Sequence, residues 1–200
     1  MAGTASSATG SPAFGRLPFA AFLCNSAEHS VVSGLRLTTR HCVAKNLHVR
    51  FHVLDDPDDQ REAVLSSARA VIWDGHGGWV DDAPAVDGAR LDKVLTSTDR
   101  ITAEVLVVGC CWGGTADYTE FVSRHISAPL VYIGCEERAG KTHGSKVFPP
   151  LMDALASRSP GAASEGLRDV LQRALDTAVA EHPELGKSAW KAAVLKPEDS

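Results

Sequence analysis

Three uninterrupted apolar runs constrain the fold of this chain more than any other feature of its sequence. They are "VIWD" (71–74), "EVLVVG" (104–109) and "PLVYIG" (129–134). Apolar runs of this length that do not alternate with polar residues are typical of strands that are covered on both faces. Segments with helical patterns lie between the runs, and that alternation predicts an α/β fold with a mainly parallel sheet and helices on both of its faces.

The remaining segments complete a predicted sheet of about six strands. An apolar run at 17–25 and an alternating run at 47–53 each predict a strand, and the alternation suits a position at the sheet edge. Residues 188–197 predict the last strand. Predicted helices begin near Ser26 and cover 58–70, 88–97 and 117–126. The next predicted helix starts late, because Pro149 and Pro150 are tolerated only near its first turn. The last one runs from Ser164 and stops near Gly186.

Length and composition indicate an ordinary globular chain. Its 200 residues fit one domain, 44% of them are hydrophobic and 22% are charged. The formal net charge is −5, and no Lys/Arg cluster predicts a nucleic-acid or membrane partner. No apolar run approaches the roughly 20 residues of a transmembrane helix, and the start lacks the pattern of a signal peptide. We therefore expect a cytoplasmic protein with a flexible tail at 1–16 and one domain at 17–200.

The cysteines predict reduced thiols. Five cysteines is an odd number, and their spacing forms no disulfide framework. Cys24 and Cys42 fit a core, and Cys135 fits a buried strand end. Cys110 and Cys111 could be read in the same way, as two buried thiols, but the two glycines directly after them indicate a tight functional turn.

Two of the three apolar runs end in a residue that can do chemistry. "DGHGG" (74–78) follows the first run, and "GCCWGG" (109–114) ends the second. The carboxyl ends of parallel strands are where ligands bind in such sheets, and neighbouring strands are only about 4.8 Å apart. We therefore expect His76 and Cys111 to face each other, although His76 alone could be a turn residue bonded to the backbone.

A histidine beside a cysteine supplies the parts of a cysteine hydrolase. The imidazole can take the thiol proton and make a strong nucleophile. Backbone amides then have to stabilise the oxyanion that develops during acyl transfer. Gly77 and Gly78 allow close approach of a substrate, which makes the amides of Gly77 and the cysteine the expected donors.

These segments resemble blocks of the caspase-like (clan CD) cysteine peptidases. "DGHGG" is similar to the "SGHG" of metacaspases, which also have a double-cysteine block, and "VVGCCWGG" resembles the apolar run before the cysteine of CHAT domains. "HPELGKSAWKAAVL" (182–195) resembles the end of CHAT domains, and "IGCEERAGKTHGSKVF" (133–148) resembles the segment after the fifth family strand. The resemblance covers roughly 17–196 and implies a three-layer caspase-like fold with strand order 2-1-3-4-5-6.

The resemblance assigns roles to individual residues. It implies that Cys111 is the nucleophile, that His76 is the general base and then the general acid, and that the amides of Gly77 and Cys111 form the oxyanion hole. Metacaspases have an acidic residue just before the cysteine pair that binds a basic P1 side chain, and Gly109 stands there in this chain. Glu136 and Glu137 fall at the other position that lines this pocket, which gives the hypothesis of a basic P1 preference.

The implied activity is that of a cysteine endopeptidase that works through an acyl-enzyme. No organic cofactor is implied, although an acidic loop, Asp81, Asp82 and Asp87, gives the hypothesis of a Ca²⁺ site as in some metacaspases. The expected partners are a protein or peptide substrate and an activating partner protein on another chain. The separation of 35 residues between His76 and Cys111 is shorter than the family leads one to expect.

The same residues allow other interpretations. His76, Cys111, Cys135 and His143 include zinc ligand types, but no C-x-x-C or H-x-x-x-H spacing supports a zinc site or a metal-binding module. "GCCWGGT" lacks the lysine of a phosphate-binding P-loop, and G-x-S-x-G of a serine hydrolase is absent from the sequence. The alternative function is a catalytically inactive caspase-like domain that acts as a binding scaffold through a partner protein.

Overall fold

A computed structural model describes residues 20–24, 29–45, 47–53, 56–159, 161 and 164–198. Within these residues, six strands form the central sheet in the order β2-β1-β3-β7-β8-β9. All neighbouring pairs are parallel except β8 and β9, which are antiparallel. The α/β class and the mainly parallel sheet are thus confirmed. The predicted tail at 1–16 lies outside the described residues.

The elements of the central sheet and its covering helices follow one another along the chain. The strands are β1 (Ala20–Cys24), β2 (Val49–Val53), β3 (Ala70–Asp74), β7 (Val105–Val108), β8 (Leu130–Cys135) and β9 (Trp190–Leu195). The helices are α1 (His29–Ala44), α2 (Pro57–Val64), α3 (Leu91–Val94), α4 (Ala116–Arg124), α5 (His143–Ala156), α6 (Ser164–Glu181) and a 3-10 turn η1 (Pro183–Ser188).

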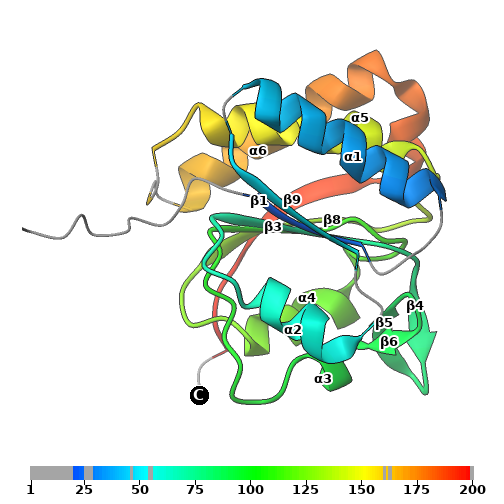
Figure 1. Cartoon of the computed structure of the whole chain (residues 1–200), viewed down its shortest axis with the longest axis vertical. Helices are drawn as coiled ribbons and strands as arrows, with labels where there is room; N and C mark the ends of the chain where they lie inside the picture. The colour runs from blue at the N-terminus through cyan, green and yellow to red at the C-terminus, as the bar shows by residue number, and fades with distance from the viewer. Residues whose placement is uncertain are drawn as a thin grey trace, which may run out of the picture.

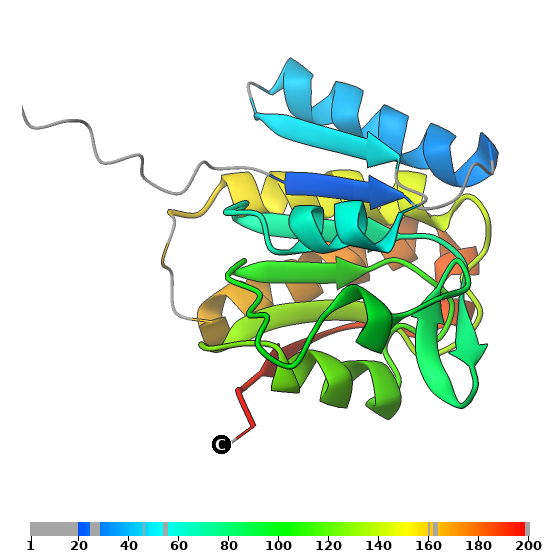
Figure 2. The ribbon, with the colours of Figure 1, turned by 60° about the horizontal axis from the view of Figure 1, so that its bottom comes forward.

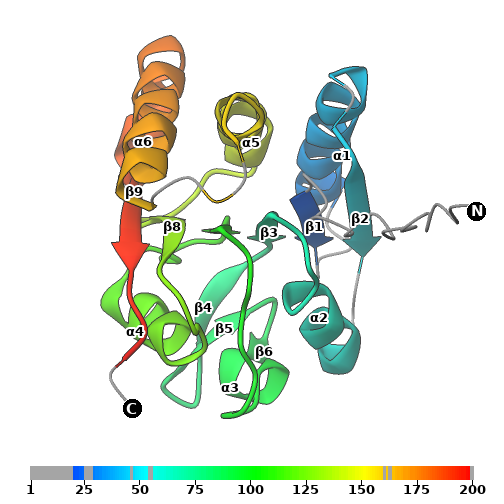
Figure 3. The same cartoon turned by 90° about the vertical axis from the view of Figure 1, so that its left-hand side faces the viewer.

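Helices cover both faces of the sheet, which explains the continuous apolar strands. Figures 1 and 3 show α1, α5 and α6 on one face and α2, α3 and α4 on the other. Two hydrophobic clusters fill the two spaces between the layers. Ile72 of β3 belongs to one cluster and its neighbours Val71 and Trp73 to the other, because successive side chains of a strand point to opposite faces. Every residue of β3, β7 and β8 is therefore buried.

A small antiparallel sheet was not predicted from the sequence. It consists of β4 (Gly77–Val80), β5 (Ala83–Val86) and β6 (Ala89–Arg90). Asp81 and Asp82 form the turn between β4 and β5, both with positive φ. Figure 2 shows this hairpin beside the arrowheads of the central strands, at their carboxyl ends. The sheet therefore lies on the side of the fold where ligands of parallel sheets bind.

The start of α5 differs from the prediction. The helix begins at His143 and contains Pro149 and Pro150, so the prediction that it starts late was wrong. Each proline lacks an N–H and so removes one bond of the helix ladder. Phe148, Leu151 and Met152 beside the prolines are buried in the core, and this burial offsets the lost hydrogen bonds. The predicted stop at Gly186 is also misplaced, because α6 ends at Glu181 and η1 begins at Pro183.

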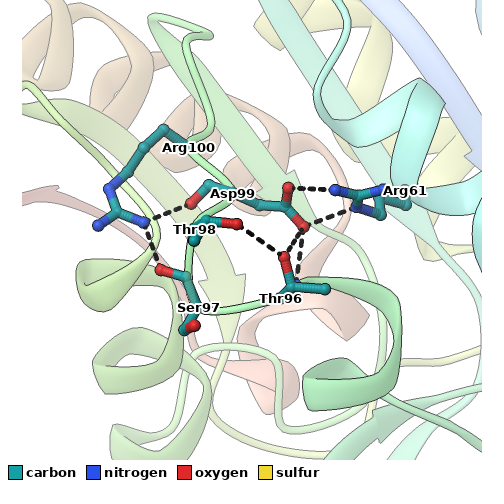
Figure 4. A network of polar contacts seen from close by, with 6 residues as sticks. All are labelled: Arg61, Thr96, Ser97, Thr98, Asp99 and Arg100. Carbon is teal, nitrogen blue, oxygen red and sulfur yellow. Dashed lines mark hydrogen bonds and ion pairs between the residues drawn. The ribbon is translucent and has the colours of Figure 1, made fainter.

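A polar network ties α2 to the loop before β7 (Figure 4). Asp99 is 7% exposed and accepts two hydrogen bonds from the Arg61 guanidinium, at 2.7 and 2.6 Å. It also accepts from the amide and the hydroxyl of Thr96, at 2.7 and 2.9 Å. These hydrogen bonds, those from Arg61 first, hold the pKa of the Asp99 carboxyl below its usual range.

Stability should therefore fall on acidification through Asp99. Its folded pKa lies below the unfolded value of about 3.9, so its contribution is present above that pH and is lost as the pH falls through and below it. We expect Asp99→Asn to lower the urea midpoint at pH 6 and to approach the wild type at pH 3. Asp176→Asn, at an exposed site on α6, serves as the control. A gap between wild type and Asp99→Asn that is equal at both pH values would contradict this assignment.

Candidate functional site

The ends of β3 and β7 bring the predicted histidine and cysteine segments together. The two strands are neighbours, with Trp73 opposite Val108. Gly77 lies so close to the Cys111 segment that an added Cβ would be 1.9 Å from the Cys111 carbonyl oxygen and 2.8 Å from the Cys110 sulfur. Only a glycine allows this approach. The two turns therefore meet at one rim of the sheet. That the His76 imidazole faces the Cys111 sulfur stays a prediction.

The His76 turn is held by Asp87. The Asp87 carboxylate accepts from the His76 amide at 2.7 Å, and the Asp87 amide donates to the His76 carbonyl at 2.7 Å. Asp87 has a φ of 48°, a conformation that few residues other than glycine adopt. From the sequence alone, Asp87 was expected only as part of an acidic loop with a hypothetical Ca²⁺ site. The sequence shows only a carboxylate eleven residues after the histidine. Its contact with the His76 turn can be inferred only once the β4–β5 hairpin is known.

Cys111 differs from the other cysteines in its exposure. Cys42, Cys110 and Cys135 are buried, whereas Cys111 is partly exposed, with its sulfur 3.7 Å from the Ala139 carbonyl oxygen. Burial raises the pKa of Cys42 to about 11 and that of Cys135 to about 12, and it raises that of Cys110 well above the usual thiol value. Among the described cysteines, Cys111 is therefore the one whose surroundings suit a reactive thiol. This exposure supports the prediction that Cys111, and not Cys110, is the nucleophile.

The loop after Cys111 uses its own amides internally. Four consecutive amides donate to backbone carbonyls at 2.8–3.2 Å: Trp112 to Glu137, Gly113 to Cys110, Gly114 to Cys135 and Thr115 to Trp112. Such a loop has no ring of amides left to surround a phosphate. Within the described part of the chain, the amide of Cys111 donates to no protein acceptor, and neither does that of Gly77. Gly77 lies opposite Val86 at a non-hydrogen-bonded position of the hairpin, so its N–H points away from β5.

The predicted substrate-binding residues fall in different surroundings. Gly109 is buried against the Asp74 carboxyl and the Phe148 ring, where an added Cβ would be 2.7 Å from each. Both carboxylate oxygens of Glu136 are 2.7 Å from the Lys191 ammonium on β9, so its charge is already paired. Glu137 is exposed, and its carbonyl accepts from the Trp112 amide at 3.1 Å. Of the two acids, only Glu137 touches the loop of Cys111 through its backbone.

Two buried groups behind the rim were not singled out from the sequence. Asp74 ends β3, is 7% exposed and accepts from the Gly75 amide at 3.1 Å. Burial, with the nearby charge of Asp87, raises the pKa of Asp74 well above its usual value. The Tyr118 hydroxyl accepts from the Gly78 amide at 3.0 Å and lies 2.6 Å from the Ala85 carbonyl oxygen. Tyr118 thereby joins α4 to the hairpin that carries Gly77.

The proposed metal ligands do not gather. Among the described residues, no group of three or more His, Cys, Asp or Glu side chains is placed to hold a metal ion. The ring of His143 is buried, and its Nδ1 accepts from the Gly140 amide at 3.0 Å. Asp81 pairs with Arg90 at 3.4 Å. The hypothesis of a Ca²⁺ site at the acidic loop stays a prediction.

A partly open pocket lies at the opposite end of the sheet. A cavity of about 340 Å³ is lined by Cys42, Met152 and Arg69, the residue directly before β3. It is therefore distant from the rim that carries His76 and Cys111.

No helix among the described residues is long and apolar enough to cross a membrane.

Comparisons with known proteins found similarity only to solved structures. No family model matches the chain, and no curated protein matches it. One structure is that of Ssu72, whose phosphatase activity is fine-tuned by modifications on the C-terminal domain of RNA polymerase II. It is 12% identical, with a TM-score of 0.36, and the match covers 90% of this chain and 98% of that one. A serine phosphatase of this superfamily from Drosophila melanogaster is 11% identical, with a TM-score of 0.36 and coverage of 88% and 98%.

A third structure is Ssu72 of Drosophila melanogaster with Symplekin, bound to a phosphopeptide mimic. It is 12% identical, has a TM-score of 0.35 and covers 90% of this chain and 98% of its own. At these values the likeness gives this chain neither the fold nor the activity of those proteins. Symplekin and the peptide mimic are partners of that phosphatase alone.

The comparisons correct the resemblance to caspase-like peptidases. The similar structures are phosphatases, and no model of a peptidase family matches. The resemblance rested on short motifs, each of which marks a tight turn after a buried strand, and such turns recur in unrelated α/β folds. The assignments as a caspase-like or CHAT-type cysteine endopeptidase and as an inactive caspase-like scaffold were therefore wrong.

Proposed function

We propose that this chain carries out covalent thiol catalysis on an activated acyl group, an ester or a thioester. In this proposal Cys111 is the nucleophile, His76 accepts its proton, and the amides of Gly77 and Cys111 stabilise the oxyanion. The single observation that carries it is that an accessible thiol, Cys111, lies beside the backbone amides of Gly77 and Cys111, which donate to no acceptor among the described residues. Gly109 and Glu137 belong to the rim of the same site, and no cofactor takes part.

The chemistry follows from what the rim offers. The Cys111 thiolate would attack the carbonyl carbon, the alcohol or thiol would leave, and water would then release the acid and restore the thiol. An ester or thioester leaving group departs as an anion, so the reaction does not depend on protonation of an amine. Phosphoryl transfer is less well supported, because the amides of the loop after Cys111 are already bonded within the protein. We also propose that the partner of this chain is a protein or peptide and that the chain acts in the cytoplasm.

Alkylation with iodoacetamide tests the nucleophile. The wild-type protein is treated at pH 7.5 and the labelled cysteines are identified by mass spectrometry. Each unit by which burial raises a thiol pKa lowers the thiolate fraction about tenfold, so we expect Cys111 to react at least about 10-fold faster than Cys42 or Cys135. The proposal is overturned if a buried cysteine reacts first. Cys42→Ala serves as a control that leaves the labelling of Cys111 unchanged.

Hydrolysis of p-nitrophenyl acetate tests the reaction. We expect Cys111→Ala to abolish turnover, and His76→Ala to lower kcat/KM by about 100-fold or more, since general-base catalysis contributes about that much. The same proteins are assayed with p-nitrophenyl phosphate. Turnover of the phosphate but not of the acetate would refute acyl chemistry, and equal turnover by wild type and Cys111→Ala would refute the nucleophile.

A further inference from the structure

An exposed tryptophan stands next to the candidate site. Trp79 lies on β4, two residues after Gly77, and is 42% exposed. The other large hydrophobic side chains that the structure describes as exposed, Leu37 and Val43, lie on α1. The Trp79 ring is 5.6 Å from that of Trp112 between centroids, tilted by 48°, and 6.3 Å from that of Tyr118. Trp79 and Trp112 thus form an aromatic pair at the rim.

The second ring of the pair is fixed beside the thiol. Trp112 directly follows Cys111 and has a φ of 58°, an outlier for a bulky residue. Its amide donates to Glu137, and its carbonyl accepts from both the amide and the hydroxyl of Thr115, at 2.9 and 2.8 Å. A strained residue persists only where its surroundings fix it, and such residues cluster at sites that bind ligands. The position of Trp112 is therefore determined by the same loop that presents the thiol.

A carboxylate gives this aromatic pair a charge preference. The Trp79 indole N–H donates to Asp117 Oδ2 at 2.8 Å, and Asp117 is exposed in the first turn of α4. Among the described residues, no Lys, Arg or His forms an ion pair with Asp117. Donation to an anion makes the indole ring richer in electrons, and tryptophan is already the aromatic side chain that binds cations best. Both features favour a cation over a neutral or anionic group.

We propose that Trp79, Trp112 and Asp117 form a subsite that binds a quaternary ammonium group beside Cys111. The rings offer faces but no hydrogen-bond acceptors, and one carboxylate oxygen already accepts from an indole, which suits a cation without N–H donors. As a specificity element for catalysis, the subsite rests on the proposed function of Cys111. Binding itself does not need a reactive thiol, so it can be measured separately.

Tryptophan fluorescence of the Cys111→Ala protein tests the subsite. Trp73 and Trp190 are 1% and 5% exposed, so a ligand in solution acts mainly on the other two tryptophans. The probes are choline and its neutral isostere 3,3-dimethyl-1-butanol. We expect choline to change the emission saturably and to bind at least about 10-fold more tightly than the isostere, a ratio typical of combined cation–π and ionic contacts.

Variants separate the rings from the charge. Trp79→Leu should weaken choline binding about 10-fold, and Asp117→Asn, which keeps an oxygen acceptor for the indole, about 3-fold to 5-fold. Leu37→Ala on α1 is the matched control and should leave binding unchanged. Equal binding of choline and the isostere, or no saturable change with choline, would overturn the subsite. Since labelling of Cys111 in the wild type uses no choline, failure of the subsite and failure of the nucleophile are distinguishable.

Discussion

Replacement of Gly77 by alanine should disrupt the rim and remove the reactivity of Cys111. The new Cβ would be 1.9 Å from the carbonyl oxygen of Cys111 and 2.8 Å from the Cys110 sulfur. The closest atom belongs to the backbone, so no side-chain rotation relieves the contact, and the β4 strand has to move away. Overpacking of this kind costs about 3 kcal/mol. We expect that loss in urea unfolding, together with at least about 10-fold slower alkylation of Cys111.

Gly78→Ala is the matched control for this change. It adds the same methyl group one residue later, where nothing lies within 4 Å of the added Cβ. Its unfolding midpoint and the rate of Cys111 alkylation should stay within error of the wild type. If Gly77→Ala behaves like Gly78→Ala in both measurements, the close approach of the two segments is not a feature of the protein in solution.

Replacement of Arg69 by methionine should cost about 3–5 kcal/mol of stability, the usual result of breaking a buried ion pair by removing one partner. Arg69 is 2% exposed, and its guanidinium donates to Glu104 at 2.9 Å. It also donates to the carbonyls of Leu155, Arg158 and Ser159, at 2.7–3.1 Å. These carbonyls lie at and beyond the end of α5, where helix carbonyls have no partner within the helix. Arg69 therefore joins the start of β3 to the end of α5.

Urea unfolding of two further variants checks the role of Arg69. Arg69→Lys keeps the charge but has no planar fork, so it should recover only part of the loss. Arg36→Met, at an exposed position on α1, should change the free energy of unfolding by less than about 0.5 kcal/mol. A loss below about 1 kcal/mol in Arg69→Met would show that the four hydrogen bonds do not anchor the helix.

The continuous apolar runs at β3, β7 and β8 determined the α/β class, because a strand that is buried on both faces has apolar residues at nearly every position. The same logic placed His76 and Cys111 at carboxyl ends of strands, and neighbouring strands then bring those ends together. The motifs around these residues did not determine the family. A glycine-rich turn after a buried strand is required by the backbone geometry at that point. Unrelated protein families that share this geometry therefore have similar short sequences there.

Only the tertiary structure decided what surrounds the two residues. Asp87 bonds the His76 amide across a hairpin, Trp79 on β4 contacts Trp112 in the loop after β7, and Lys191 on the last strand pairs with Glu136. Each of these contacts joins segments that are 11–55 residues apart, and no local periodicity encodes them. Exposure also separates Cys111 from Cys110, although the two are neighbours in the chain. The sequence by itself determined which strands are buried, while packing between distant segments decided which thiol, carboxylate and ring share the rim.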